Sequence, residues 1–110
     1  MLSMMLSRAA SGLLRALIQR IGEEPDKVLL SEFKTVGWQS LTFVGERHVL
    51  GLRVPGPDAM ALVARFIDSI EEAEFSIPGQ ILADIAVVGT PVRELDGSIN
   101  LVIEALTVAE

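Results

Sequence analysis

The chain has 110 residues, of which 50% are hydrophobic and 22% charged, so we expect one globular domain over residues 1–110 and not a disordered tail. It has no cysteine, which excludes disulfides, thiolate catalysis and cysteine metal sites. The formal net charge of −6 disfavours binding to the phosphate backbone of nucleic acids. No apolar run approaches the ~20 residues that cross a bilayer, so we expect a cytoplasmic protein that binds no membrane.

The N-terminal segment predicts a first helix over residues 6–21, after a frayed start at 1–5. Its apolar residues recur at helical spacing, and Gly22 with Pro25 shortly after it stops the helix. We interpret this helix as one that packs on the domain. Two alternatives stay open, binding to a membrane surface and an organellar targeting peptide, because the segment is basic and contains no acidic residue.

Three strands are predicted between this helix and the next one, because apolar segments alternate there with glycine-containing turns. The segments are residues 28–36, 39–44 and 47–54. We place Gly45 and Glu46 at the centre of a tight hairpin of type II′, since glycine suits its first central position. The resulting register pairs Phe43 with His48 and puts His48 on the face that a helix covers.

A second, central helix is predicted over residues 57–73. Pro57 suits the first helical position, and apolar residues follow it at spacings of three and four. Two further strands cover residues 80–88 and 99–108 and are joined through a hairpin at Asp96-Gly97. Without bulges, this hairpin would place Glu104 opposite Gly89.

These elements predict an α+β fold, with a single antiparallel sheet of about five strands over residues 28–108 and two helices, in the order α-β-β-β-α-β-β. The last two strands are apolar on both faces, so the sheet needs cover on both sides. Either the two helices lie on opposite faces, or they share one face and a partner covers the other. We therefore expect a homodimer.

The element order is similar to that of two families. The double-stranded RNA-binding domain begins in the same way, but that family needs a lysine-rich start to its second helix, and this chain has Pro57-Asp58-Ala59-Met60 there. Small acidic secretion chaperones are similar to this chain in element order, size, acidity and dimeric habit. Those chaperones bind unfolded protein segments along apolar grooves, so this resemblance implies a dimer that binds a protein segment.

Two polar residues lie in apolar strands. His48 is the only histidine, so multi-histidine metal sites are excluded, and we expect no metal and no cofactor. Asp84 interrupts an apolar strand, where a carboxylate is costly unless it is paired or solvated. Each has a structural interpretation, His48 as a histidine at the edge of the core and Asp84 as the partner of a backbone amide at a bulge or of an arginine. The candidate arginines are Arg47, Arg53 and Arg65.

Trp38 follows Gly37 at the end of a predicted strand, where it packs against the sheet end or anchors a partner. The sequence has no glycine-rich phosphate loop, nucleophile elbow or His-Glu metal pattern. We therefore expect a non-catalytic protein-interaction domain, adaptor-like or chaperone-like, that acts as a homodimer and does not bind nucleic acid. The alternative is a small-ligand-binding protein or an enzyme with a pocket near His48 and Asp84, which Arg47 or Arg53 would complete.

Overall fold

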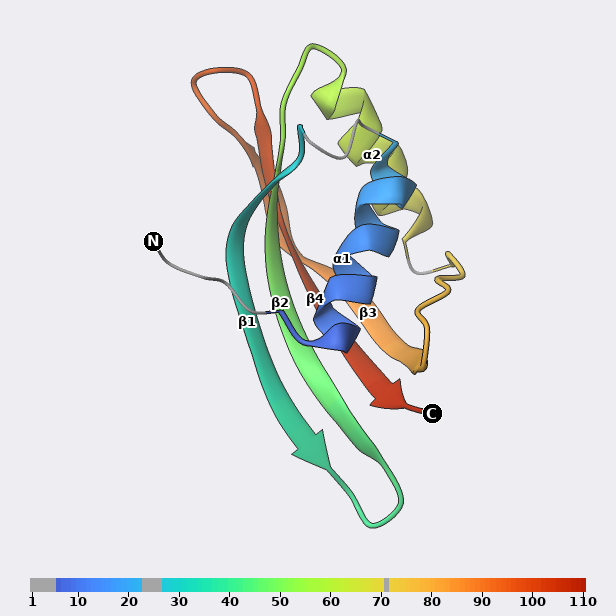
Figure 1. Ribbon diagram of the computed structural model, residues 1–110. Coiled ribbons are helices and arrows are strands. Elements are labelled where there is room, and N and C mark those ends of the chain that lie inside the picture. The colour runs from blue at the N-terminus through green and yellow to red at the C-terminus, as the bar shows by residue number, and fades with distance from the viewer. Residues whose placement is uncertain (1–5, 23–26, 71) are drawn as a thin grey trace.

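The computed structural model describes residues 6–22, 27–70 and 72–110, so the predicted frayed start at 1–5 lies outside the described residues (Figure 1). Four strands of the described part form one antiparallel sheet in the order β1-β2-β4-β3. The elements are α1 (Arg8–Ile21), β1 (Leu29–Gln39), β2 (Val44–Val54), α2 (Ala59–Ser69), β3 (Gln80–Arg93) and β4 (Ile99–Ala109). The α+β class with two helices and one antiparallel sheet is thus confirmed. The fifth strand is wrong, because the order is α-β-β-α-β-β.

The predicted turn at Gly45-Glu46 is also wrong, because both residues lie inside β2. The turn comes earlier, where the backbone N–H of Ser40 donates to the carbonyl of Phe43 at 2.8 Å and the Phe43 N–H donates to Oγ of Ser40 at 3.1 Å. Serine favours turns because its hydroxyl bonds to nearby backbone groups. The predicted strand 39–44 is therefore mostly the turn itself, since β1 ends at Gln39 and β2 begins at Val44. His48 pairs with Thr35 and not with Phe43.

Gly45 is needed for close packing and not for a turn. A type II′ turn requires a positive φ at its glycine, and Gly45 is not among the glycines with positive φ. A Cβ atom at this position would overlap the backbone carbonyl oxygen of Thr107 on β4 and would lie 2.8 Å from Nε1 of Trp38. Glycine thus allows the indole of Trp38 and strand β4 to approach β2 closely.

Helix α1 lies close to its predicted limits, whereas α2 is shorter than predicted. Helix α1 starts at Arg8 because Ser7 is its N-cap, with Oγ accepting from the Ala10 N–H at 3.1 Å. It ends at Gly22, whose positive φ of 87° allows its N–H to donate to the Ile18 carbonyl. Helix α2 is shorter than the predicted 57–73, since it begins after Asp58 and ends at Ser69.

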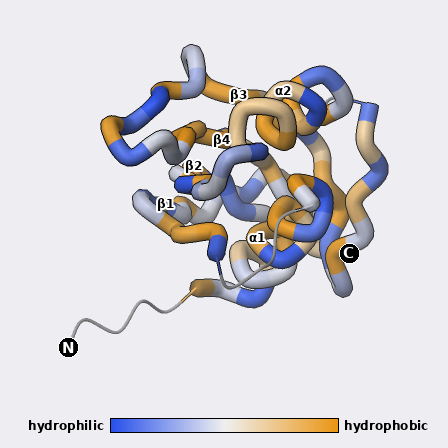
Figure 2. Tube along the Cα trace, turned by 90° about the horizontal axis from the view of Figure 1, so that it is seen from above, coloured by the Kyte–Doolittle hydropathy of each residue, from blue (hydrophilic) through white to orange (hydrophobic). Residues whose placement is uncertain are grey.

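Both helices pack on the same face of the sheet (Figures 1 and 2). Their apolar sides form one core with the central strands, because every second residue of a strand points to the same face. Fully buried members of this core include Leu13, Leu17, Phe66, Leu50, Leu52, Leu101 and Ile103. Of the two predicted arrangements, the structure has the one in which the helices share a face.

The predicted hairpin at Asp96-Gly97 is confirmed, and Gly97 has the positive φ of 88° that such a turn needs. Strand β3 is longer than predicted and shifts its register twice, between Leu82 and Asp84 and between Val88 and Val92. Glu104 consequently lies opposite Ala86 and not opposite Gly89. A proline in the second irregular stretch has no N–H to pair, which explains why regular pairing fails there.

Candidate functional site

The face of the sheet that carries neither α1 nor α2 is called the open face here. Its side chains alternate along each strand with those of the buried core, for example Arg47 and Val49 with His48 and Leu50 on β2. Four rows of this face each take one residue from β1, β2, β4 and β3 in that order. They are Trp38, Gly45, Val108 and Ile81; Val36, Arg47, Leu106 and Asp84; Lys34, Val49, Glu104 and Ala86; and Glu32, Gly51, Val102 and Val88.

Apolar side chains are exposed on both margins of the open face. Val36 on β1 is 50% exposed, and Ile81 and Val88 on β3 are 53% and 45% exposed. Between them, the central strands contribute apolar residues that are partly buried, such as Val102 and Leu106. The apolar surface therefore extends from one edge of the sheet to the other.

A single ion pair lies across the two central strands of the open face in the described part of the chain. Nη1 of Arg47 on β2 lies 3.9 Å from Oε1 of Glu104 on β4, and both side chains remain about half exposed. Exposed pairs at such a distance contribute little to folding, because water and salt screen them. Both groups remain accessible to charges from outside the chain.

His48 lies on the opposite, helix-covered face and has no exposed surface. Its Nδ1 is 3.0 Å from the hydroxyl of Thr35, and its Nε2 is 2.9 Å from that of Thr107. Burial lowers the pKa of His48 below 6.5, although Glu46 opposes this shift. The imidazole is therefore a neutral, hydrogen-bonded core group with no access to a ligand from solvent.

Asp84 lies on the open face, at the first bulge of β3. Its side chain is exposed, and Oδ1 accepts from the backbone N–H of Ile85 at 3.0 Å. The hollow beside it has a volume of only about 190 Å³. Because His48 and Asp84 occupy opposite faces, the structure does not bring them together as the sequence-based alternative requires.

Arg53 contributes to a polar cluster at the end of the sheet. Its guanidinium donates to Oγ of Ser98 at 2.8 Å and to Oδ2 of Asp96 at 3.1 Å. Hydrogen bonds from Ser98, assisted by Arg53, lower the pKa of Asp96 to about 2. The Asp96-Gly97 motif predicts the turn, but the contact with Arg53 depends on a pairing between distant strands.

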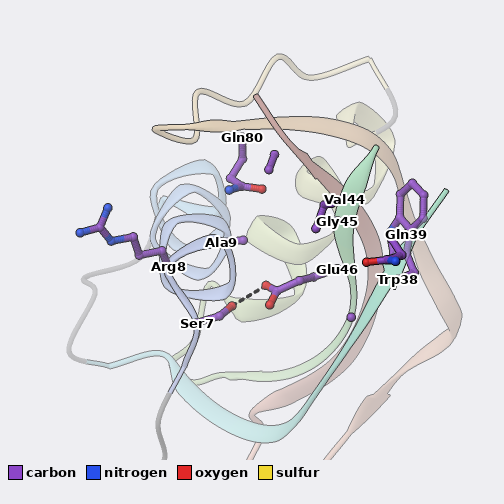
Figure 3. Close-up of a pocket in the computed structure, with 11 residues that line it drawn as sticks. Ser7, Arg8, Ala9, Trp38, Gln39, Val44, Gly45, Glu46 and Gln80 are labelled. Carbon is purple, nitrogen blue, oxygen red and sulfur yellow. Dashed lines mark hydrogen bonds between the residues drawn. The ribbon is translucent and has the colours of Figure 1, made fainter. Parts of the chain in front are cut away.

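A larger hollow, of about 580 Å³, lies between the start of α1 and the ends of β1 and β2 (Figure 3). Ser7 donates from Oγ to Oε1 of Glu46 at 2.6 Å, and Figure 3 shows Arg8 directed away from the hollow. Trp38 also lines it, and its Nε1 is buried with no hydrogen-bond partner in the described structure. The hollow contains a Ser–Glu contact but no described nucleophile–histidine pair.

Comparison with known proteins gives no match, whether to a family model, to a curated protein or to a solved structure. Among the described residues, no group of three or more histidine and acidic side chains is arranged to hold a metal ion. No helix in the described ranges has the length and apolar character needed to span a membrane.

Proposed function

We propose that this chain is a non-catalytic protein-interaction module whose contact surface is the open face of the sheet. The observation that carries the proposal is the placement of both helices on one face, which leaves a four-stranded sheet with exposed apolar side chains on the other. Extended apolar surfaces on soluble proteins mark sites of association.

The composition of the open face supports this proposal. Protein interfaces combine an apolar centre with polar groups and are enriched in tryptophan and arginine. The open face combines the apolar residues Val36, Ile81 and Val88 with Trp38 and Arg47. Both Trp38 and Arg47 are among the residues that the sequence identifies as candidate partner contacts.

The placement of the polar candidates supports a binding role over a catalytic one. A catalytic site needs groups that converge on one accessible volume. His48 is buried in the core, whereas Asp84 is exposed on the other face and accepts a hydrogen bond from the backbone N–H of Ile85. The remaining candidates, Arg47 and Arg53, each contact an acidic side chain. Arg53 also donates to the hydroxyl of Ser98, at the far end of the sheet from Asp84 and on the other face from His48.

Site-specific photo-crosslinking in the native cell tests the proposal. A photoreactive residue at Val88, on the open face, is compared with one at Met60 on α2, which has a similar exposed fraction of 49% against 45%. We expect adducts of defined mass from Val88 and none from Met60. Adducts from Met60 alone, or an absence of adducts from Val88, would contradict the proposal.

A further inference from the structure

The charges of the open face are divided between the two halves of the sheet. Cations are in excess on β1 and β2, whereas the described side chains of β3 and β4 on this face carry carboxylates and no cation. The charged residues are Glu32, Lys34, Arg47 and Arg53 on β1 and β2, and Asp84 and Glu104 on β3 and β4. One half of the face therefore complements the other half in charge.

This division has a consequence for symmetric pairing. A twofold axis parallel to the strands, between β2 and β4, places β1 over β3 of a second copy and β2 over β4. Each row then faces the same row of the second copy, with the order of the strands reversed. Arg47 therefore lies over Leu106 of the second copy and next to Glu104 of the second copy. By the same operation Lys34 lies over Ala86, beside Asp84 of the second copy. Basic residues thus meet acidic residues at both places.

The alternative face-to-face arrangement has a twofold axis perpendicular to the strands. An axis through the row of Lys34 and Glu104 places Lys34 over Lys34 of the second copy, and Glu104 over Glu104. Like charges that face each other across an interface disfavour association. Electrostatics therefore favours the axis parallel to the strands.

We propose that the occupant of the open face is a second copy of this chain, packed face to face about a twofold axis parallel to the strands. The inference rests on the proposed function and adds the partner and its orientation. The contact covers the exposed side chains of Val36, Ile81 and Val88, which no described helix covers. Around the axis, Arg47 and Glu104 of the two copies form a ring of four alternating charges.

The geometry of the ion pair within one chain is compatible with this ring. The 3.9 Å separation and half-exposed side chains of Arg47 and Glu104 leave unused donors and acceptors on both groups. On association, each group gains a second partner of opposite charge while water is excluded. The attraction within the ring is then larger than that of the exposed pair in the isolated chain.

Charge reversal with sedimentation equilibrium tests the proposal. We expect the wild-type chain to have twice its chain mass of 11.9 kDa at micromolar concentration. Arg47→Glu and Glu104→Arg should each raise the dimer dissociation constant roughly tenfold or more, because each creates like-charge contacts across the axis. Arg65→Glu, an exposed reversal on α2, is the matched control and should leave the dissociation constant unchanged.

An equimolar mixture of the Arg47→Glu and Glu104→Arg variants makes the test specific. In a mixed dimer, the carboxylate introduced at position 47 of the first variant meets the guanidinium introduced at position 104 of the second, and the native Arg47 and Glu104 meet at the symmetric position. We therefore expect the mixture to associate about as tightly as the wild-type chain. A loss of folding would not be rescued by mixing, and circular dichroism of each variant alone confirms that its fold is retained.

The outcomes separate this inference from the proposed function. A wild-type monomer whose Val88 crosslinks to a different protein would overturn the second copy as occupant and leave the proposed function standing. A dimer that is insensitive to both reversals would show that association uses another surface. Two weakened variants without rescue on mixing would contradict the axis parallel to the strands.

Discussion

Replacement of Gly45 by alanine tests the register on which the open face depends. The new Cβ would overlap the backbone carbonyl of Thr107 and approach Nε1 of Trp38 to 2.8 Å. The first obstacle is backbone of the central strand β4, which cannot move without disturbing the sheet. Because overpacking costs about 1–3 kcal/mol, we expect a loss near 3 kcal/mol in the free energy of unfolding.

Gly37→Ala is the matched control, because Gly37 lies in β1 and a Cβ there would have no atom within 4 Å. Its φ is not positive, so alanine should be neutral or stabilise the protein by up to about 1 kcal/mol through the entropy of the unfolded chain. At about 4 °C per kcal/mol for a domain of this size, Gly45→Ala lowers the Tm by about 12 °C.

Urea denaturation followed by far-ultraviolet circular dichroism measures both variants without relying on Trp38, which contacts the altered site. A Gly45→Ala variant as stable as Gly37→Ala would contradict the close approach of Gly45 to the Thr107 carbonyl. Gly45→Asn adds a second check, since asparagine is tolerated in many turns with positive φ. Within β2, however, it should cost at least as much as alanine.

Three further predictions concern the polar groups. Burial lowers the pKa of His48 in the folded chain, so as the pH falls the unfolded chain is the first to take up a proton at this histidine. The free energy of unfolding should therefore fall as the pH drops through 6.5. His48→Gln should flatten this pH dependence in urea titrations between about pH 7.5 and 5.5. Asp84→Ala should cost only about 1 kcal/mol in the same denaturation assay, because the exposed carboxylate makes one bond to the Ile85 N–H, and a cost above about 3 kcal/mol would reveal a buried role. Ser98→Ala should raise the pKa of Asp96 from about 2 toward 3.8 in a titration by nuclear magnetic resonance, and an unchanged pKa would contradict the assigned hydrogen bonds.

The parts of the fold that sequence predicts well are those with local signals. The end of α1 follows from Gly22, and the β3–β4 hairpin follows from Asp96-Gly97. Each signal acts within a few residues, so a single sequence contains all the required information.

The first hairpin shows where this reasoning fails. A glycine between two apolar segments has the same appearance whether it provides a positive φ or simply lacks a Cβ. At Gly45 the second role applies, and its cause is Thr107, which is 62 residues away in the chain. Only the three-dimensional pairing of β2 with β4 distinguishes the two roles.

The candidate site was predictable to a similar degree. The alternation of β2 correctly places His48 on the helix-covered face, but its hydroxyl partners depend on pairing with β1 and β4. The surplus of apolar residues on β3 and β4 indicates an uncovered face. The bulges of β3 decide which residues meet across that face, and their positions depend on the whole sheet.

The central claim is that two copies pack through their open faces about a twofold axis parallel to the strands. The distance between the β1–β2 turns of the two copies in solution tests it most directly. The chain has no cysteine, so Thr42→Cys in the exposed turn between β1 and β2 accepts a single spin label. The proposed dimer places both turns at the same end, and pulsed electron paramagnetic resonance should give a distance within about 25 Å. An axis perpendicular to the strands would separate the turns by about 45 Å, twice the length of the stretch from Thr42 to Val49 at about 3.3 Å per residue. That longer distance, or the absence of any dipolar coupling, would contradict the account.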